Sequence, residues 1–79
     1  MKLPRDLDGN QLAQALSKFG YEIIRQTGSH IRLTTQQQGK YYITIPSHSP
    51  LKVGTLNAIL KDVADHSGMS RDALLSQLF

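Results

Sequence analysis

Three short segments with strand signals follow one another, with only a few polar residues between them. Their ranges are Tyr21–Gln26, His30–Thr34 and Lys40–Ile45, and the connections are Thr27–Ser29 and Gln36–Gly39. Connections this short close hairpins, because a parallel pair of strands needs a crossover of a dozen or more residues. The sequence therefore predicts a three-stranded antiparallel sheet.

The segment before the first strand has the signals of an amphipathic helix. Asp8 is a good N-cap residue, and Gln11 follows three positions later, as in a capping box. Apolar residues then recur at helical spacing, namely Leu12, Ala15, Leu16 and Phe19. Gly20 is expected to end the helix in a left-handed conformation. These signals predict a helix over residues 9–19.

Two more helices are predicted after the sheet. Gly54 and Thr55 are expected to open the second helix, which should fray around His66–Gly68. Ser70 is a good N-cap residue, so a short third helix should follow it. With helices packed on one face of the sheet, the predicted fold is α+β, in the order α-β-β-β-α with an extra short C-terminal helix.

Length and composition restrict the kind of protein. A chain of 79 residues has room for one core, so residues 1–79 are expected to form a single domain. No apolar run is long enough to cross a membrane and Met1–Asp6 has no signal-peptide core, so a cytoplasmic location is expected. The chain has no cysteine, and its three histidines follow no ligand spacing. Neither a metal nor a cofactor is expected.

The charges are unevenly distributed along the chain. Up to Gly54 there are seven Lys and Arg against three Asp and Glu, whereas from Thr55 onward two bases face three acids. A basic excess suits a polyanionic partner such as nucleic acid. A net charge of +3 is common among small proteins and is a weak signal by itself.

Alternation in the second and third strands separates two faces of the predicted sheet. The core face should carry Ile31, Leu33, Tyr41, Ile43 and Ile45. The opposite face is expected to be open and to carry His30, Arg32, Thr34, Lys40, Tyr42 and Thr44. Tyr42 is of a type that stacks on RNA bases, although exposed strand tyrosines are common. The open face is thus predicted to be basic and to include an aromatic ring.

His30 is the best candidate for chemistry. It begins a strand directly after Gly28 and Ser29, and the glycine leaves room beside the imidazole. Histidine accepts and returns a proton near neutral pH, which RNA cleavage without metal requires of its base. Judged from spacing alone, an ordinary exposed strand residue is the commoner explanation.

A second group of candidates lies at the start of the second helix. Lys52 and Thr55 would place a cation and free backbone N–H groups where a phosphate can bind. Alternatively, Thr55 caps the helix and Lys52 is a solvated loop charge. His48 is a candidate acid, a phosphate contact or a plain loop residue. Arg25 and Arg32 are of a type that contacts phosphate, although strand arginines often only keep a wet face soluble.

Several segments, taken in order, resemble the HicA (YcfA-like) toxin family. They are Gly28-Ser29-His30, Ile45–His48 and Leu51–Lys61, and the resemblance extends to Leu12–Tyr21. Together they cover nearly the whole chain. One departure is the stretch Asp62–Ser70, which is longer than the link between the last two helices in many members.

The resemblance implies a fold like that of double-stranded-RNA-binding domains. It also implies the toxin of a type II toxin–antitoxin system, an endoribonuclease that cleaves mRNA without metal and is neutralised by a HicB-type antitoxin. The family's catalytic histidine falls on His30. Contacts with RNA or phosphate are then expected at Arg32, Gly28, Ser29, His48, Lys52 and Thr55. The alternatives are a non-catalytic RNA-binding module of the same fold and a pure protein-interaction domain.

Overall fold

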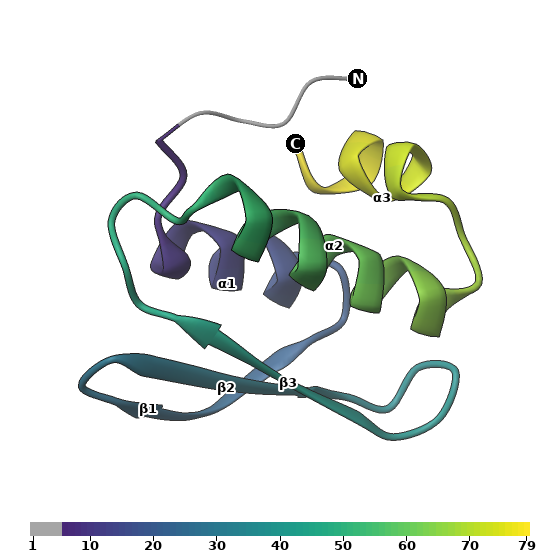
Figure 1. Ribbon diagram of the computed structural model, residues 1–79. Helices are drawn as coiled ribbons and strands as arrows, with labels where there is room; N and C mark the ends of the chain where they lie inside the picture. Colours follow the sequence, from purple (N-terminus) through teal and green to yellow (C-terminus); the bar gives the residue numbers. More distant parts are fainter. Residues whose placement is uncertain (1–5) are drawn as a thin grey trace.

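A computed structural model describes residues 6–79 and confirms the α+β architecture (Figure 1). Its elements are α1 (Gly9–Lys18), β1 (Glu22–Thr27), β2 (His30–Thr35), β3 (Tyr41–Pro46), α2 (Val53–Ser67) and α3 (Arg71–Leu78). The strands form one antiparallel sheet in the order β1-β2-β3. Lys2 and Arg5, which contribute to the basic excess, and most of the Met1–Asp6 segment lie outside the described residues.

The core lies between the helices and one face of the sheet, and α3 packs on α1 and α2. The side chains that are fully buried come from five of the six elements, and they are Leu12, Leu16, Ile31, Leu33, Ile45, Leu60, Val63, Leu74 and Leu75. Burying this apolar surface is the main favourable term in folding. Among the described helices, none combines the length and apolar character that a bilayer span requires.

Local signals determine both ends of α1. Asp8 and Gln11 form the predicted capping box, with the Gln11 N–H donating to Asp8 Oδ1 at 2.7 Å. The helix ends one residue earlier than predicted, because Phe19 is its cap. Gly20 adopts φ +107°, and the Tyr21 N–H donates to the Leu16 carbonyl at 3.0 Å. The chain thereby turns from α1 into the sheet through a Schellman-type end.

The predicted start of α2 is one residue late. The helix begins at Val53 with Lys52 as N-cap, so Thr55 is its third residue. Leu51 is buried and its N–H donates to the Leu7 carbonyl at 2.8 Å, which anchors the chain just before the helix. The far end lies within the predicted range, because α2 continues to Ser67 and Gly68 closes it at φ +68°. A left-handed glycine is a common helix ending.

The strands differ from the prediction in detail. β1 starts at Glu22, since the Tyr21 N–H donates to the Leu16 carbonyl at the end of α1, and β1 contains a bulge between Ile23 and Arg25. Thr34 was expected on the open face, yet it is only 8% exposed, and its hydroxyl donates to the Tyr41 carbonyl at 3.0 Å. Its position between strand neighbours on both sides shields it from solvent.

Gly9 lies where α1 meets the loop that follows β3. A Cβ atom at this position would meet the Pro46 carbonyl oxygen and would lie 2.9 Å from Ser47 Cα. We expect Gly9→Ala to lower the free energy of unfolding by about 1–3 kcal/mol, because backbone must move to make room. Urea unfolding measures the change. Gly54→Ala is the control, since a Cβ there meets nothing within 4 Å and alanine favours helix. An equal loss in both variants would contradict this expectation.

Tyr21 is 4% exposed, and its hydroxyl has no hydrogen-bond partner among residues 6–79. Burial, followed by the nearby Tyr41 and Asp62, raises the pKa of Tyr21 above its ordinary value of 10.0. The folded state therefore holds the phenol proton of Tyr21 more tightly than the unfolded state does. The contribution of Tyr21 to stability is complete below pH ~10 and decreases as the pH rises further.

We expect Tyr21→Phe to reduce that alkaline decrease in stability. At neutral pH the variant should be as stable as the wild type or more so, because no hydrogen bond is lost. Unfolding free energies measured at neutral pH and above pH ~10 give the comparison. The same alkaline loss in both proteins would show that Tyr21 does not cause it.

Candidate active site

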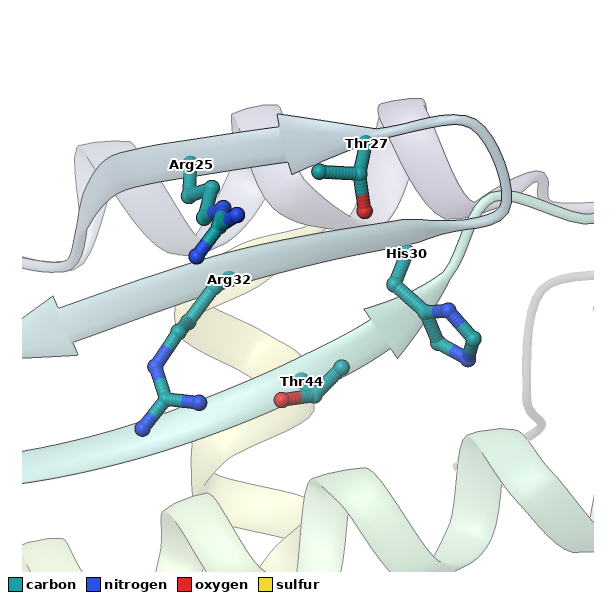
Figure 2. A pocket seen from close by; sticks show the side chains of 5 residues that line it. All are labelled: Arg25, Thr27, His30, Arg32 and Thr44. Carbon is teal, nitrogen blue, oxygen red and sulfur yellow. The ribbon is translucent and has the colours of Figure 1, made fainter.

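A pocket opens on the sheet face that the helices leave free (Figure 2). Its volume is about 200 Å³, and it is lined by Arg25, Thr27, His30, Arg32 and Thr44. The antiparallel register arranges these side chains in two rows across the strands. Thr27 is opposite His30 in one row, and Arg25, Arg32 and Thr44 form the next. Three strands thus contribute to one site.

The short hairpin between β1 and β2 creates these rows. Only Gly28 and Ser29 lie between the paired residues Thr27 and His30. Side chains two positions apart on a strand share a face, so Arg25 follows Thr27 onto the pocket side. The bulge in β1 lies beyond Arg25, on the side away from the hairpin, and therefore leaves the pocket register intact.

The pocket concentrates positive charge. Arg25 and Arg32 are direct partners on neighbouring strands, an arrangement that is unfavourable for like charges. The only ion pair among residues 6–79 joins Arg71 and Asp72, at 3.7 Å. Neither pocket arginine therefore has a carboxylate partner in this part of the chain, and both guanidinium groups can donate hydrogen bonds to an anion.

Arg32 is held by an aromatic ring. Its guanidinium carbon lies 5.0 Å from the centroid of the Tyr42 ring, and Lys40 Nζ lies 5.5 Å from the same centroid. Hydrogen bonding to Tyr42 also raises the pKa of Lys40 above its ordinary value. A cation–π contact positions a cation without cancelling its charge. This part of the open face therefore stays positive.

His30 is exposed at the start of β2, next to the turn. Its Nδ1 atom lies 3.0 Å from Ser29 Oγ. A hydroxyl both donates and accepts, so Ser29 can bond to this nitrogen in either tautomer of the ring. Nε2 forms no hydrogen bond within the described chain, which leaves it for a substrate. The pocket therefore combines a proton acceptor with two arginines and two threonine hydroxyls.

The turn beside His30 is attached to the segment that follows β3. Ser47 Oγ donates to the Gly28 carbonyl at 2.9 Å, and the Ser47 N–H donates to the Ser29 carbonyl at 2.9 Å. A Cβ atom on Gly28 would meet nothing within 4 Å, so packing within the chain does not require glycine there. The backbone of the turn is restrained, while the space beside it is open.

Comparison with known proteins identifies the family. The family model described as "HicA toxin of bacterial toxin-antitoxin" matches residues 9–64, which include α1, the whole sheet and most of α2. The chain belongs to the HicA toxin family. No curated protein and no solved structure matches it. Membership in a toxin–antitoxin family implies an antitoxin partner for this toxin.

In this HicA toxin, only some of the predicted site residues lie in or beside the pocket. His30 and Arg32 line it, and Gly28 and Ser29 form the adjacent turn. Three other predicted residues are not among those that line it: His48 and Lys52 are exposed, and Thr55 is half-buried in the first turn of α2. Their roles stay predictions.

Sequence reasoning assigned no site role to Thr27 or Thr44, although both line the pocket. Two signals were available in the sequence. Alternation already placed Thr44 on the open face, and a two-residue hairpin loop would have placed Thr27 opposite His30.

The third histidine, His66, contacts other parts of the fold and lies outside the pocket. The His66 ring stacks on Tyr41 with a centroid distance of 4.4 Å and an interplanar angle of 13°. Its Nε2 lies 3.0 Å from the carbonyl oxygens of both Gln37 and Gly39, so a proton on Nε2 is shared between two acceptors. His66 thereby holds the turn between β2 and β3 against the end of α2.

We expect His66→Ala to lower the free energy of unfolding by about 1–2 kcal/mol, because it removes the ring contact and the hydrogen bonds to the turn. Amide exchange over residues 36–40 should become faster. His48→Ala is the matched control, since that side chain is exposed and should change stability by less than about 0.5 kcal/mol. Similar stability of the two variants would rule out this role for His66.

Proposed function

We propose that this HicA toxin is an endoribonuclease that cleaves mRNA without a metal ion, with His30 as its general acid and base. The observation that carries the proposal is the composition of the pocket. His30 shares it with Arg25 and Arg32, which have no carboxylate partner within the described chain. Attack on an RNA phosphodiester needs this combination of a proton acceptor and cationic groups.

The proposed reaction starts at a ribose 2′-hydroxyl. His30 Nε2 takes its proton while the 2′-oxygen attacks the adjacent phosphorus, and the bond from phosphorus to the 5′-oxygen breaks. The imidazolium then returns the proton to the leaving 5′-oxygen. The products are a 2′,3′-cyclic phosphate and a 5′-hydroxyl end. Arg32 stabilises the negative charge that grows on the phosphoryl oxygens.

Ser29 supports His30 in this scheme. Its hydroxyl is 3.0 Å from Nδ1, the ring nitrogen that does not face the substrate. While Nε2 acts as the base, the neutral ring carries its proton on Nδ1, so Nδ1–H donates to Ser29 Oγ both before and after Nε2 gains a proton. The ring orientation is thereby kept through the cycle.

Further RNA contacts are proposed outside the pocket, on phosphates that flank the cleaved one. Lys52 is the N-cap of α2, and no side chain caps that helix end. The free N–H groups of the first turn, including that of Thr55, are donors that suit phosphate. His48 lies in the loop that leads to this helix. Since the proposed substrate is mRNA, the toxin would act in the cytoplasm.

A HicB-type antitoxin is proposed to neutralise the toxin by covering this pocket. The two arginines favour a partner surface that supplies carboxylates, because complementary charge stabilises and steers association. Such a partner would exclude RNA from His30 without changing the fold.

We expect His30→Ala to slow RNA cleavage by about 10²–10⁴-fold in buffer containing EDTA, because one proton-transfer group is lost. The measurement is the initial rate of cleavage of a single-stranded RNA, together with growth arrest on expression. Binding of a 2′-O-methylated RNA, which cannot be cleaved, should stay within a few-fold of the wild type. Lys61→Gln, on the exposed side of α2, is the control for the loss of one polar surface group.

Equal cleavage by His30→Ala and the wild type would refute the assignment of His30. If neither protein cleaves RNA but both bind it, the toxin is a non-catalytic RNA-binding module. If neither binds RNA at low salt, the open face serves a protein partner instead.

A further inference from the structure

We propose that Arg25 and Arg32 form a clamp for a single phosphate group, and that Tyr42 is the residue that positions Arg32 in this clamp. That this phosphate belongs to an RNA backbone rests on the proposed function. The anion site itself rests on the pocket alone.

The register brings the two arginines together. They are direct partners on β1 and β2, and Cβ atoms of such partners lie about 4.5–5.5 Å apart. Figure 2 shows Arg25 reaching from β1 toward β2 and Arg32 reaching from β2 across β3. Both side chains line the same pocket, so a phosphate bound in it would accept hydrogen bonds from both guanidinium groups.

The surroundings select an anion. No carboxylate pairs with either arginine in residues 6–79, so their mutual repulsion is relieved only by water, salt or a bound anion. Thr27 and Thr44 add neutral hydroxyl donors to the same pocket. Its volume of about 200 Å³ is many times the roughly 10–15 Å³ that one water needs in the same measure, which leaves room for a group the size of a phosphate.

Tyr42 supplies the contact that would hold Arg32 in place. An acidic residue at this position would also fix the guanidinium, but it would neutralise it and compete with phosphate. The Tyr42 ring lies 5.0 Å from the guanidinium carbon and leaves the charge available. Tyr42 is two residues from Thr44 on the same strand, so it stands on the same face, beside the clamp.

The clamp is tested with two probes: a fully 2′-O-methylated single-stranded RNA of twelve nucleotides and inorganic phosphate. Arg25→Gln and Arg32→Gln should each weaken binding of the RNA about 10-fold and flatten its salt dependence. Because both would contact one phosphate, the double variant should lose much less than the product of the two single losses. Lys61→Gln removes one exposed positive charge outside the pocket and should bind within two-fold of the wild type.

Two results would overturn the clamp. One is wild-type affinity for both probes in the two single arginine variants. The other is a double variant whose loss equals the full product of the single losses, since the arginines would then contact separate phosphates.

The role of Tyr42 is tested with inorganic phosphate, which has no base to stack. Tyr42→Leu should weaken phosphate binding about two- to five-fold and should reduce the shift of the Arg32 Nε–H signal on titration, whereas Tyr42→Phe should behave as the wild type. If Tyr42→Leu weakens binding of the RNA but not of phosphate, the ring stacks on a base instead and the positioning role is wrong.

These outcomes are separable from those for the proposed function, because they are measured as binding and not as cleavage. Full activity of His30→Ala would rule out His30 as the general acid and base, but it would not affect the proposed anion site. Unchanged binding in the arginine variants would rule out the clamp, but it would not affect the proposed role of His30.

Discussion

The register of the hairpin between β1 and β2 is the constraint on which the candidate site depends. Two residues, Gly28 and Ser29, connect the strands, so Thr27 must lie opposite His30 and Arg25 opposite Arg32. A slip of one residue would turn Arg25 toward the helices and disassemble the pocket, because successive side chains of a strand alternate between faces. The anchoring of this turn to Ser47 keeps the register next to the end of β3.

The two faces of the sheet have different roles: one packs in the core and the other carries the candidate site. Its helix-covered face is apolar and carries Ile31, Leu33 and Ile45, which are fully buried. The other face is open to solvent and carries Arg25 and Arg32, which have no carboxylate partner within the described chain. Two like charges opposite each other cost stability, so their presence without an acidic partner supports the proposed anion site.

Prediction from sequence succeeded where the signals are local. The capping box at Asp8 and the glycine after Phe19 located α1 to within one residue, because both depend on neighbours in the chain. The start of α2 also lies within one residue of the prediction, although the bond from Leu51 to Leu7 that precedes it joins distant segments. His30 and Arg32 were correctly placed on the open face, yet their meeting with Arg25, Thr27 and Thr44 in one pocket needed the register of all three strands.

The sequence by itself determined the order of the elements, the antiparallel sheet and the face on which His30 lies, because turn length, alternation and capping act over a few residues. Only the tertiary structure decided that Thr34 is shielded and that His66 stacks on Tyr41 and holds a distant turn. It also decided that Arg32 rests on Tyr42. These contacts join residues from different elements, and their geometry exists only once the sheet has paired and the helices have packed on it.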